Sequence, residues 1–332
     1  MGFAEELLEK ARKLNKKIVL PESEDERTLR AAERLSKEKI TGVVLVGEPD
    51  KVRAAAKTAG ANIDACELLS PLDQKRSGPL AEKLYQLRKE KGMTLEEARE
   101  QIKCPLYFST MLLKIGEVDG YVAGGGFHST GQKLKPPLQI IKAVPGIKTV
   151  SSFFLMIHPD PKWGERGVML YADCGMVEQP TAEQLADIAV ASAKSFRQLV
   201  GVEPRVALLS YSTKGSAKSA DTEKVVKAAE LARKAAPDVK IDGELQFDAA
   251  IIPAVAERKV KGGSNVAGKA NVFVFPDLDA GNIAYKITER LCGAQALGPL
   301  LQGMAKPTHD LSRGCSADDI VKVCAVAAIM SV

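Results

Sequence analysis

The sequence predicts an α/β protein with two domains. Its 332 residues exceed the size at which a single hydrophobic core usually stops growing. Short apolar segments alternate with amphipathic ones along most of the chain, which is the pattern of parallel strands covered by helices on both faces. Hydrophobic residues make up 45% of the chain and charged residues 27%, as is ordinary for a globular protein.

The first part of the chain starts with an amphipathic helical segment and then alternates strand and helix. Asp50 is positioned to cap a helix that ends near Gly60. A predicted strand at 119–123 runs directly into three glycines. The predicted elements of this part are strands at 17–20, 42–46 and 119–123 and helices at 24–36, 50–60 and around 81–91.

A break near Val144-Pro145-Gly146 separates a second α/β part. Its predicted strands lie at 149–157, 168–172, 206–209 and 272–275, and its helices at 182–199 (opened by Thr181), 218–235 and 280–291. The polar turn at 158–167 indicates a hairpin, and Thr181 with Gln184 forms a capping-box pattern. The helix at 317–330 is too apolar for a free tail, so we expect it to pack on the first domain. The expected domains are 1–145 plus 300–332, which is discontinuous, and 146–299.

Composition excludes several classes of function. The net charge of +5 is modest, no block of five like charges occurs, and aromatic residues are 5%, which argues against nucleic-acid binding. No apolar run approaches the roughly 20 residues of a membrane span. The six cysteines form no C-x-x-C pair, and the N-terminal segment does not resemble a signal peptide, which predicts reduced thiols and a cytoplasmic location. The three histidines lack metal-ligand spacing, so we expect no metal.

Four polar, glycine-rich segments follow predicted strands, where ligands of open α/β sheets gather. They are 124–130, 210–216, 264–268 and 277–282. Neither a P-loop nor a G-x-G-x-x-G motif occurs, so ATP and NAD sites lose their usual support. Lys214 lies among hydroxyls and is a candidate phosphate ligand, although a solvated loop lysine is an equal alternative. Cys174 follows a strand, but a buried structural thiol is the commoner case.

The segment before the last helix carries the groups that a site needs to hold an anion, steer a nucleophile and take a proton. Ser312 supplies a hydroxyl, Arg313 a guanidinium, and Asp318 and Asp319 carboxylates at the mouth of a helix, where negative charge is favoured. Ser316 and Asp319 also fit a capping box. Asp319 is therefore either a structural cap or a base, and the residues alone leave both interpretations open.

Many ordered motifs together resemble the phosphate acetyltransferase family over nearly the whole length. They include Pro21-Glu22-Ser23 with Arg27, Tyr107–Met111, His128-Ser129-Thr130, Ala172-Asp173-Cys174, Pro180–Gln184, Ser212–Ser216, Asp242–Ala250, Asn265–Gly268, Phe275-Pro276-Asp277-Leu278, Ala280–Ile283 with Tyr285 and Lys286, Gly298-Pro299 and Asp310–Gly314.

The resemblance implies both a fold and a reaction. The fold is two α/β/α domains with an interdomain cleft, like that of isocitrate and isopropylmalate dehydrogenases, usually in a homodimer. The reaction is acetyl-CoA + phosphate = CoA + acetyl phosphate, by direct attack of the CoA thiolate in a ternary complex. CoA and acetyl-CoA are then substrates, and no cofactor is tightly bound.

The resemblance also assigns roles to individual residues. Ser312, Arg313 and Asp319 are its catalytic residues. Its substrate-binding residues are Arg88, Ser129, Thr130, Lys135, Ser212, Lys214, Asn282 and Tyr285. The chain departs from the family pattern in two places. Lys135 stands where an arginine is expected, which loses the bidentate fork, and Thr308-His309 replaces a more usual valine–asparagine.

Three alternative functions compete with this interpretation. A phosphate butyryltransferase would use the same chemistry on a longer acyl chain. A non-catalytic acyl-CoA-sensing module lacks support, because Ser312, Arg313 and Asp319 are all retained. A metal- and NAD-dependent decarboxylating dehydrogenase needs a cluster of carboxylates, and Asp277 and Asp279 are too few.

Overall fold

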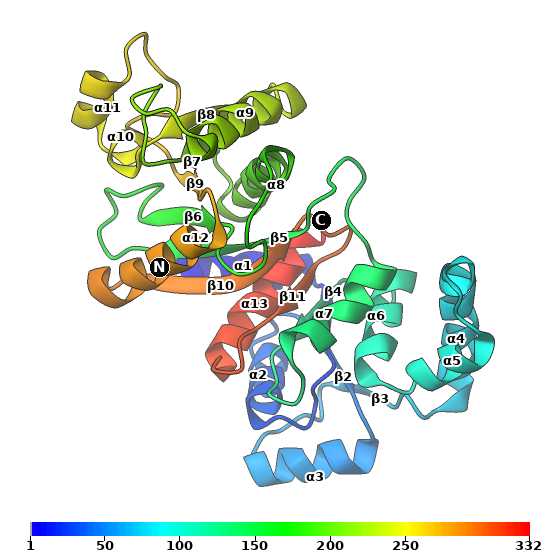
Figure 1. The fold of residues 1–332 in the computed structure, drawn as a ribbon. Coiled ribbons are helices and arrows are strands. Elements are labelled where there is room, and N and C mark those ends of the chain that lie inside the picture. Colours follow the sequence, from blue (N-terminus) through cyan, green and yellow to red (C-terminus); the bar gives the residue numbers. More distant parts are fainter. Residues whose placement is uncertain (1) are drawn as a thin grey trace. The chain divides into compact units, whose positions relative to one another are not determined.

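The computed structural model describes residues 2–332, and Figure 1 shows the course of the chain. The residues divide into two compact units, the first made of residues up to 142 together with 304–332, and the second of 143–303. For comparison, the boundaries expected from the sequence lie at 145/146 and 299/300. Each unit is an α/β structure with its own sheet, as the sequence predicts.

The first unit is built on a five-stranded parallel sheet with strand order β11-β4-β1-β2-β3. Its strands are β1 (Lys17–Leu20), β2 (Gly42–Val46), β3 (Glu67–Leu69), β4 (Gly120–Ala123) and β11 (Thr308–Asp310). Its helices are α1 (Phe3–Leu14), α2 (Glu26–Lys37), α3 (Pro49–Ala59), α4 (Gln74–Arg88), α5 (Leu95–Gln101), α6 (Pro105–Ile115), α7 (Thr130–Ile140) and α13 (Ala317–Met330), with a 3₁₀ turn at Lys89–Lys91.

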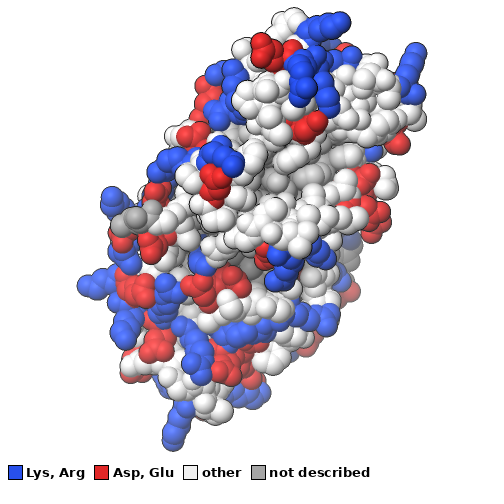
Figure 2. All heavy atoms as spheres, turned by 90° about the vertical axis from the view of Figure 1, so that its left-hand side faces the viewer, with Lys and Arg blue, Asp and Glu red and all other residues white. Residues whose placement is uncertain are grey.

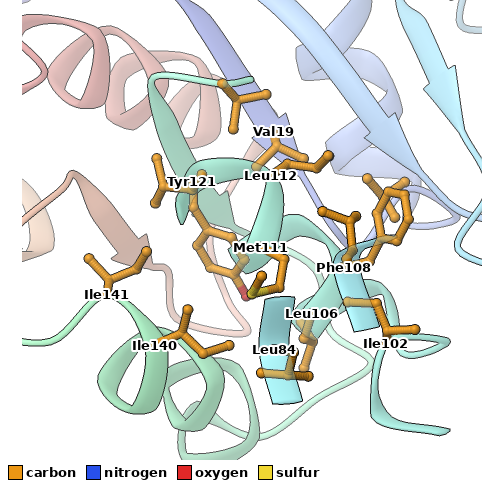
Figure 3. Close-up of a cluster of buried hydrophobic side chains, with 14 of the residues drawn as sticks. Val19, Leu84, Ile102, Leu106, Phe108, Met111, Leu112, Tyr121, Ile140 and Ile141 are labelled. Carbon is orange, nitrogen blue, oxygen red and sulfur yellow. The ribbon is translucent and has the colours of Figure 1, made fainter. Parts of the chain in front are cut away.

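Helices cover both faces of this sheet. The apolar C-terminal helix α13 packs on β4 and β1 and against α1 and α2, while α6 packs on β1, β2 and β4 and against α4 and α7. Figure 3 shows the core on the α6 side, where Phe108, Met111 and Leu112 meet Val19 and Tyr121. Burial of each of these side chains contributes about 1.5–3 kcal/mol.

The second unit has a mixed six-stranded sheet with strand order β10-β5-β6-β9-β7-β8. Its strands are β5 (Ser151–Ile157), β6 (Val168–Ala172), β7 (Arg205–Leu209), β8 (Lys240–Leu245), β9 (Val272–Val274) and β10 (Gln295–Gln302). Its helices are α8 (Ala182–Val200), α9 (Ala220–Ala235), α10 (Phe247–Ile251), α11 (Pro253–Lys259) and α12 (Leu278–Cys292). The predicted hairpin is confirmed, because β5 and β6 pair antiparallel.

Capping confirms two sequence predictions and corrects a third. Ser316 and Asp319 form a capping box at α13, and Thr181 forms one with Gln184 at α8. Asp50, however, does not cap α3. The N-cap is Glu48, because Pro49 fits the first helical position, where its missing N–H costs nothing.

Candidate active site

Three loops of the first unit meet at one edge of its sheet. Strands β1, β4 and β11 are parallel neighbours, so their carboxyl ends lie together. The loops that follow them span residues 21–25, 124–129 and 311–316. This is the edge at which open α/β sheets bind ligands.

The loop at 311–316 is anchored by hydrogen bonds to its carbonyl groups and by the buried side chains of Leu311 and Cys315. The Arg27 guanidinium donates to the carbonyl oxygens of Arg313 at 2.5 Å and Cys315 at 3.0 Å. The Cys315 thiol donates to the carbonyl of Gly124 at 3.0 Å, which ties this loop to the neighbouring one. Ser312 and Arg313 are both exposed. Within residues 2–332 the Arg313 guanidinium forms no ion pair, so it is available to an anion.

A buried charge cluster lies beneath these loops. The Lys133 side chain is 1% exposed, and its ammonium lies 3.1 Å from Asp310 Oδ1 and 3.5 Å from Glu22 Oε2. It also donates to the carbonyls of Gly125 at 2.8 Å and Leu311 at 3.3 Å. Burial raises the pKa of Asp310, although Lys133 acts in the opposite direction. The positive charge of the Lys133 ammonium and the negative charges of the two carboxylates therefore offset the cost of burying one another.

Two acidic residues of the β1–α2 loop fix the glycine-rich loop from the other side. Glu22 Oε1 accepts a hydrogen bond from the His128 N–H at 3.2 Å and lies 3.1 Å from its Nδ1. Asp25 caps α2 and accepts from the Gly126 N–H at 3.0 Å. Burial raises the pKa of Asp25, but the hydrogen bonds and charge of Arg27 and the two backbone bonds outweigh this and lower it.

The glycines of this loop allow the close approach. A Cβ at Gly124 would lie 2.7 Å from Ile320 Cγ1, and one at Gly125 would lie 2.6 Å from Glu22 Cβ. Any side chain at these positions would push the loop away from α13 and from Glu22. The loop therefore keeps its distance to residues 311–316 only with glycine.

The two carboxylates at the start of α13 are in different situations. Asp318 pairs with Arg34 at 2.6 Å and with Lys322 at 2.5 Å. Burial raises its pKa, but these two partners outweigh it and lower the pKa. Asp319 accepts from the N–H of Ser316 at 2.9 Å and from its hydroxyl at 2.8 Å. Among the described residues Asp319 has no cationic partner.

The predicted substrate-binding residues of the first unit lie at two places, at the start of α7 and at the end of α4. Ser129 is the N-cap of α7 in a capping box with Gln132, and Thr130 hydrogen-bonds to the Asp310 carboxylate. Lys135 is exposed on the same helix. Arg88 ends α4, and its Nε is buried without a hydrogen-bond partner in the part of the chain described.

In the second unit, the loop after β7 uses its polar groups internally. The Ser212 side chain is fully buried and its hydroxyl donates to Glu244 at 2.7 Å, which also accepts from the Gly215 N–H. Lys214 pairs with Asp242. Glu244 and Asp242, on the neighbouring strand β8, take up both groups.

Two further predicted residues lie on α12. The Asn282 amide donates to the carbonyl of Cys174 at 3.0 Å, and the Tyr285 ring stacks on Phe154 with centroids 4.1 Å apart. Burial raises the pKa of Tyr285. Cys174 itself is fully buried, and burial raises its thiol pKa far above the usual value, which supports the structural interpretation of this cysteine.

Further findings concern metals, membranes and surface charge. Residues 2–332 contain no group of three His, Cys, Asp or Glu side chains that would hold a metal ion. Among the helices of the same residues, none has the length and apolar character of a membrane span. Figure 2 shows acidic and basic side chains interspersed over one face, which carries no extended patch of one sign.

Comparison with known proteins assigns the chain to a class. The family model described as "Phosphate acetyl/butaryl transferase" matches residues 2–328. The chain therefore belongs to this family of acyltransferases.

Individual relatives are more specific. The phosphate acetyltransferase of Acetivibrio thermocellus is 53% identical over 331 residues, covering 100% of this chain and 98% of the relative. That of Thermoanaerobacterium thermosaccharolyticum is 50% identical over 331 residues, covering 100% of both chains. The EutD phosphotransacetylase of Staphylococcus aureus superposes with a TM-score of 0.92 at 42% identity, covering 99% of this chain and 98% of that structure.

A distant structure confirms the predicted fold class. The 4-hydroxythreonine-4-phosphate dehydrogenase of Klebsiella pneumoniae has a TM-score of 0.56 at 12% identity, covering 96% of this chain and 99% of that structure. At this identity the likeness concerns the fold alone. It agrees with the dehydrogenase-like α/β architecture that the family resemblance implies.

Sequence reasoning named Ser312, Arg313 and Asp319 but missed Lys133. One signal was available. The buried positions of α7 include Lys133, Pro137 and Ile140, spaced as the core stripe of a helix. A lysine on that stripe predicts a buried charge with a partner.

Proposed function

We propose that the phosphate acetyltransferase activity of this chain is carried out at the sheet edge formed by residues 21–25, 124–129 and 311–316. The observation that carries the proposal is the loop at 311–316. Its carbonyls accept hydrogen bonds from Arg27 and Lys133, and the side chains of Ser312 and Arg313 are exposed. They lie beside the start of α13, where N–H groups favour an anion.

Arg313 binds the phosphate group. A guanidinium offers a planar fork that matches phosphate oxygens bidentately. The same cation offsets negative charge on the acyl oxygen as the CoA sulfur attacks the acetyl carbonyl. Ser312 donates a hydrogen bond to that oxygen or to the phosphate. The new carbon–sulfur bond replaces the carbon–oxygen bond, and phosphate leaves.

Asp319 takes the thiol proton. A free thiol has a pKa near 8.5 and an aspartate near 3.9, so the transfer alone costs about 6 kcal/mol. The Asp319 carboxylate accepts hydrogen bonds from the Ser316 N–H and hydroxyl, which hold it in place at the start of α13. Because of the cost of the transfer, neighbouring cations have to stabilise the thiolate, and Arg313 is one. Asp319 is preferred to Asp318 because Asp318 is paired with Arg34 and Lys322.

The remaining predicted substrate-binding residues are assigned according to the unit in which they lie. Arg88, Ser129, Thr130 and Lys135 belong to the first unit and are assigned to phosphate or CoA. Asn282 and Tyr285 belong to the second unit, and we assign them to substrate binding as the family resemblance implies. Ser212 and Lys214 reach a substrate only if their bonds to Glu244 and Asp242 open.

Steady-state kinetics on purified protein tests these roles. Formation of acetyl-CoA from acetyl phosphate and CoA is followed for the parent chain and for Asp319→Asn, Arg313→Gln and Ser312→Ala. Asp319→Asn should lose turnover by about a hundredfold or more, on the scale of acid–base catalysis, with little change in Tm. Arg313→Gln should weaken the use of phosphate and acetyl phosphate. Unchanged kinetics in either variant refutes that assignment.

Acyl-chain preference is measured in the reverse direction, with acyl-CoA and phosphate as substrates. The family description covers acetyl and butyryl transfer, and the named relatives are phosphate acetyltransferases. Acetyl-CoA should therefore react faster than propionyl-CoA and butyryl-CoA at equal concentration. A preference for butyryl-CoA overturns the acetyl assignment.

We also propose that the chain forms a homodimer and works in the cytoplasm with CoA as a substrate and no tightly bound cofactor. Helix α12 supports the dimer because Ile283, Ile287 and Leu291 form one stripe and are 57%, 50% and 80% exposed. Light scattering should give twice the chain mass of 35.6 kDa, and Ile287→Lys should lower it. A monomeric parent chain refutes the proposal. The cytoplasmic location rests on six cysteines without C-x-x-C spacing.

A further inference from the structure

Lys133 connects the loops that present the proposed catalytic groups. Its ammonium is almost fully buried and lies within 3.5 Å of four oxygen atoms. Two belong to the carboxylates of Glu22 and Asp310, and two to the backbone carbonyls of Gly125 and Leu311. These four residues come from the segments that follow β1, β4 and β11 or end them, so one side chain on α7 touches all three.

The two kinds of contact have different consequences. The carboxylates balance the buried charge, since an ammonium without an anion at this depth would cost several kcal/mol. The carbonyls are not needed for charge balance. They fix the orientation of two peptide groups, because an ammonium donates along defined directions to each oxygen.

Those two peptide groups determine the course of the loops that form the proposed site. The Leu311 carbonyl belongs to the peptide that joins Leu311 to Ser312, so its orientation determines where the Ser312 backbone begins. The Gly125 carbonyl belongs to the peptide before Gly126, whose N–H is held by Asp25. Loss of the ammonium would free the carbonyls of Gly125 and Leu311, while the Leu311 N–H bond to the Ala123 carbonyl at 2.9 Å and the Cys315 thiol bond to Gly124 would remain.

We propose that Lys133 is a positioning residue for acetyl transfer, which holds the 124–129 and 311–316 loops in register through the carbonyls of Gly125 and Leu311. The proposal rests on the proposed roles of Ser312 and Arg313. Lys133 does not touch a substrate, because its ammonium is enclosed by its four oxygen partners. Its effect therefore falls on the rate of the chemical step through the position of Ser312.

The test separates charge balance from positioning. Lys133→Met removes the cation and leaves two carboxylates unpaired, so it should lower both Tm and turnover. The triple variant K133M/E22Q/D310N removes the cation and both anions, so Tm should recover. Turnover should stay about 10- to 100-fold below the parent chain, because a displacement near 1 Å can cost that much. Lys306→Met is the matched control. This lysine also donates to a backbone carbonyl, that of Leu113 at 2.7 Å, and its loss should leave turnover within about threefold.

Hydrogen exchange gives a second readout that does not depend on turnover. Amides of 311–316 and 124–129 should exchange faster in the triple variant, while those of α6 should match the parent chain. Parent-like turnover in a folded K133M or triple variant overturns the proposal, as does parent-like exchange in both loops. If Ser312→Ala and Arg313→Gln leave turnover unchanged, the proposed site has failed instead, and loop exchange still reports on Lys133.

Discussion

Replacing His309 by asparagine should make the first unit less sensitive to acid. His309 lies in β11 with a fully buried side chain, and burial lowers its pKa from 6.5 to about 3. The unfolded chain binds a proton at this imidazole below about pH 6.5, and the folded chain does so only near pH 3. The unfolded state therefore holds more protons in this window, and the free energy of unfolding falls as the pH is lowered through it.

The size of the effect follows from the same two pKa values. Each unit of pKa difference corresponds to about 1.4 kcal/mol. Linkage then gives a loss of about 2 kcal/mol between pH 7.5 and pH 5 from His309 alone. Asparagine does not titrate, so His309→Asn lacks this component. The variant also leaves a smaller side chain in the core, which lowers its stability by an amount that is the same at every pH.

Urea denaturation followed by circular dichroism measures the difference. The gap in unfolding free energy between the parent chain and His309→Asn should shrink by about 2 kcal/mol from pH 7.5 to pH 5. Trp163 is the single tryptophan and lies in the second unit, so its fluorescence reports on the part of the chain without His309. His158→Gln, which removes a histidine of the second unit, serves as a control. Parallel pH dependences for the parent chain and His309→Asn would refute the argument that burial keeps this imidazole neutral.

Three further predictions concern packing, polar burial and metals. Asp173→Ala should lower the free energy of unfolding, measured by urea denaturation, by about 3 kcal/mol, because the buried carboxylate accepts hydrogen bonds from the Ser152 hydroxyl and from three N–H groups at 175–177. A decrease below about 1 kcal/mol contradicts this. Gly124→Ala should lower Tm through a Cβ 2.7 Å from Ile320, at a cost of about 1–3 kcal/mol, and an unchanged Tm would show that the loop yields freely. Dialysis against EDTA should leave acetyl transfer unchanged, because the proposed reaction assigns charge stabilisation to Arg313 and no step to a metal ion, and activity that returns only with a divalent ion would refute this.

Local patterns in the sequence predicted the central strands and several helix ends. Strands β1, β2 and β4 are short apolar runs, and the capping boxes at Thr181 and Ser316 begin helices where expected. These features depend on residues close together in sequence. Periodicity and capping therefore suffice to find them.

Two edge strands, β10 and β11, and the helix α7 were not predicted from the sequence. Strand β10 contains Gly298-Pro299, which indicates a turn, but it is an edge strand, where a proline without an N–H is tolerated. Strand β11 is the polar sequence Thr308–Asp310 at the edge of the other sheet. Helix α7 includes Pro136 and Pro137, which local rules place outside helices. Tertiary packing decides each of these cases.

The site divides in the same way between local and tertiary information. The chemical character of Ser312, Arg313 and Asp319 is visible in the sequence, because an anion-binding loop before a helix needs those groups. The partners of Lys214 and Ser212 are not visible, since Asp242 and Glu244 approach from a neighbouring strand. A hydroxyl or ammonium in a loop can face a ligand or a neighbouring carboxylate, and only the fold distinguishes them.

Lys133 and Lys135 show most clearly the difference between what the sequence reveals and what only the fold reveals. They lie two residues apart on α7, so they point to nearly opposite sides of the helix, and one is buried while the other is exposed. A lysine on the buried side survives only if the fold supplies anions, and here Glu22 and Asp310 come from the ends of two other strands of the same sheet. The sheet must therefore bring β1, β4 and β11 together before this ion cluster exists. The same assembly places the Leu311 carbonyl on the ammonium and Ser312 next to it in the chain, so the loop proposed to be catalytic depends on the same arrangement of strands as the buried cluster.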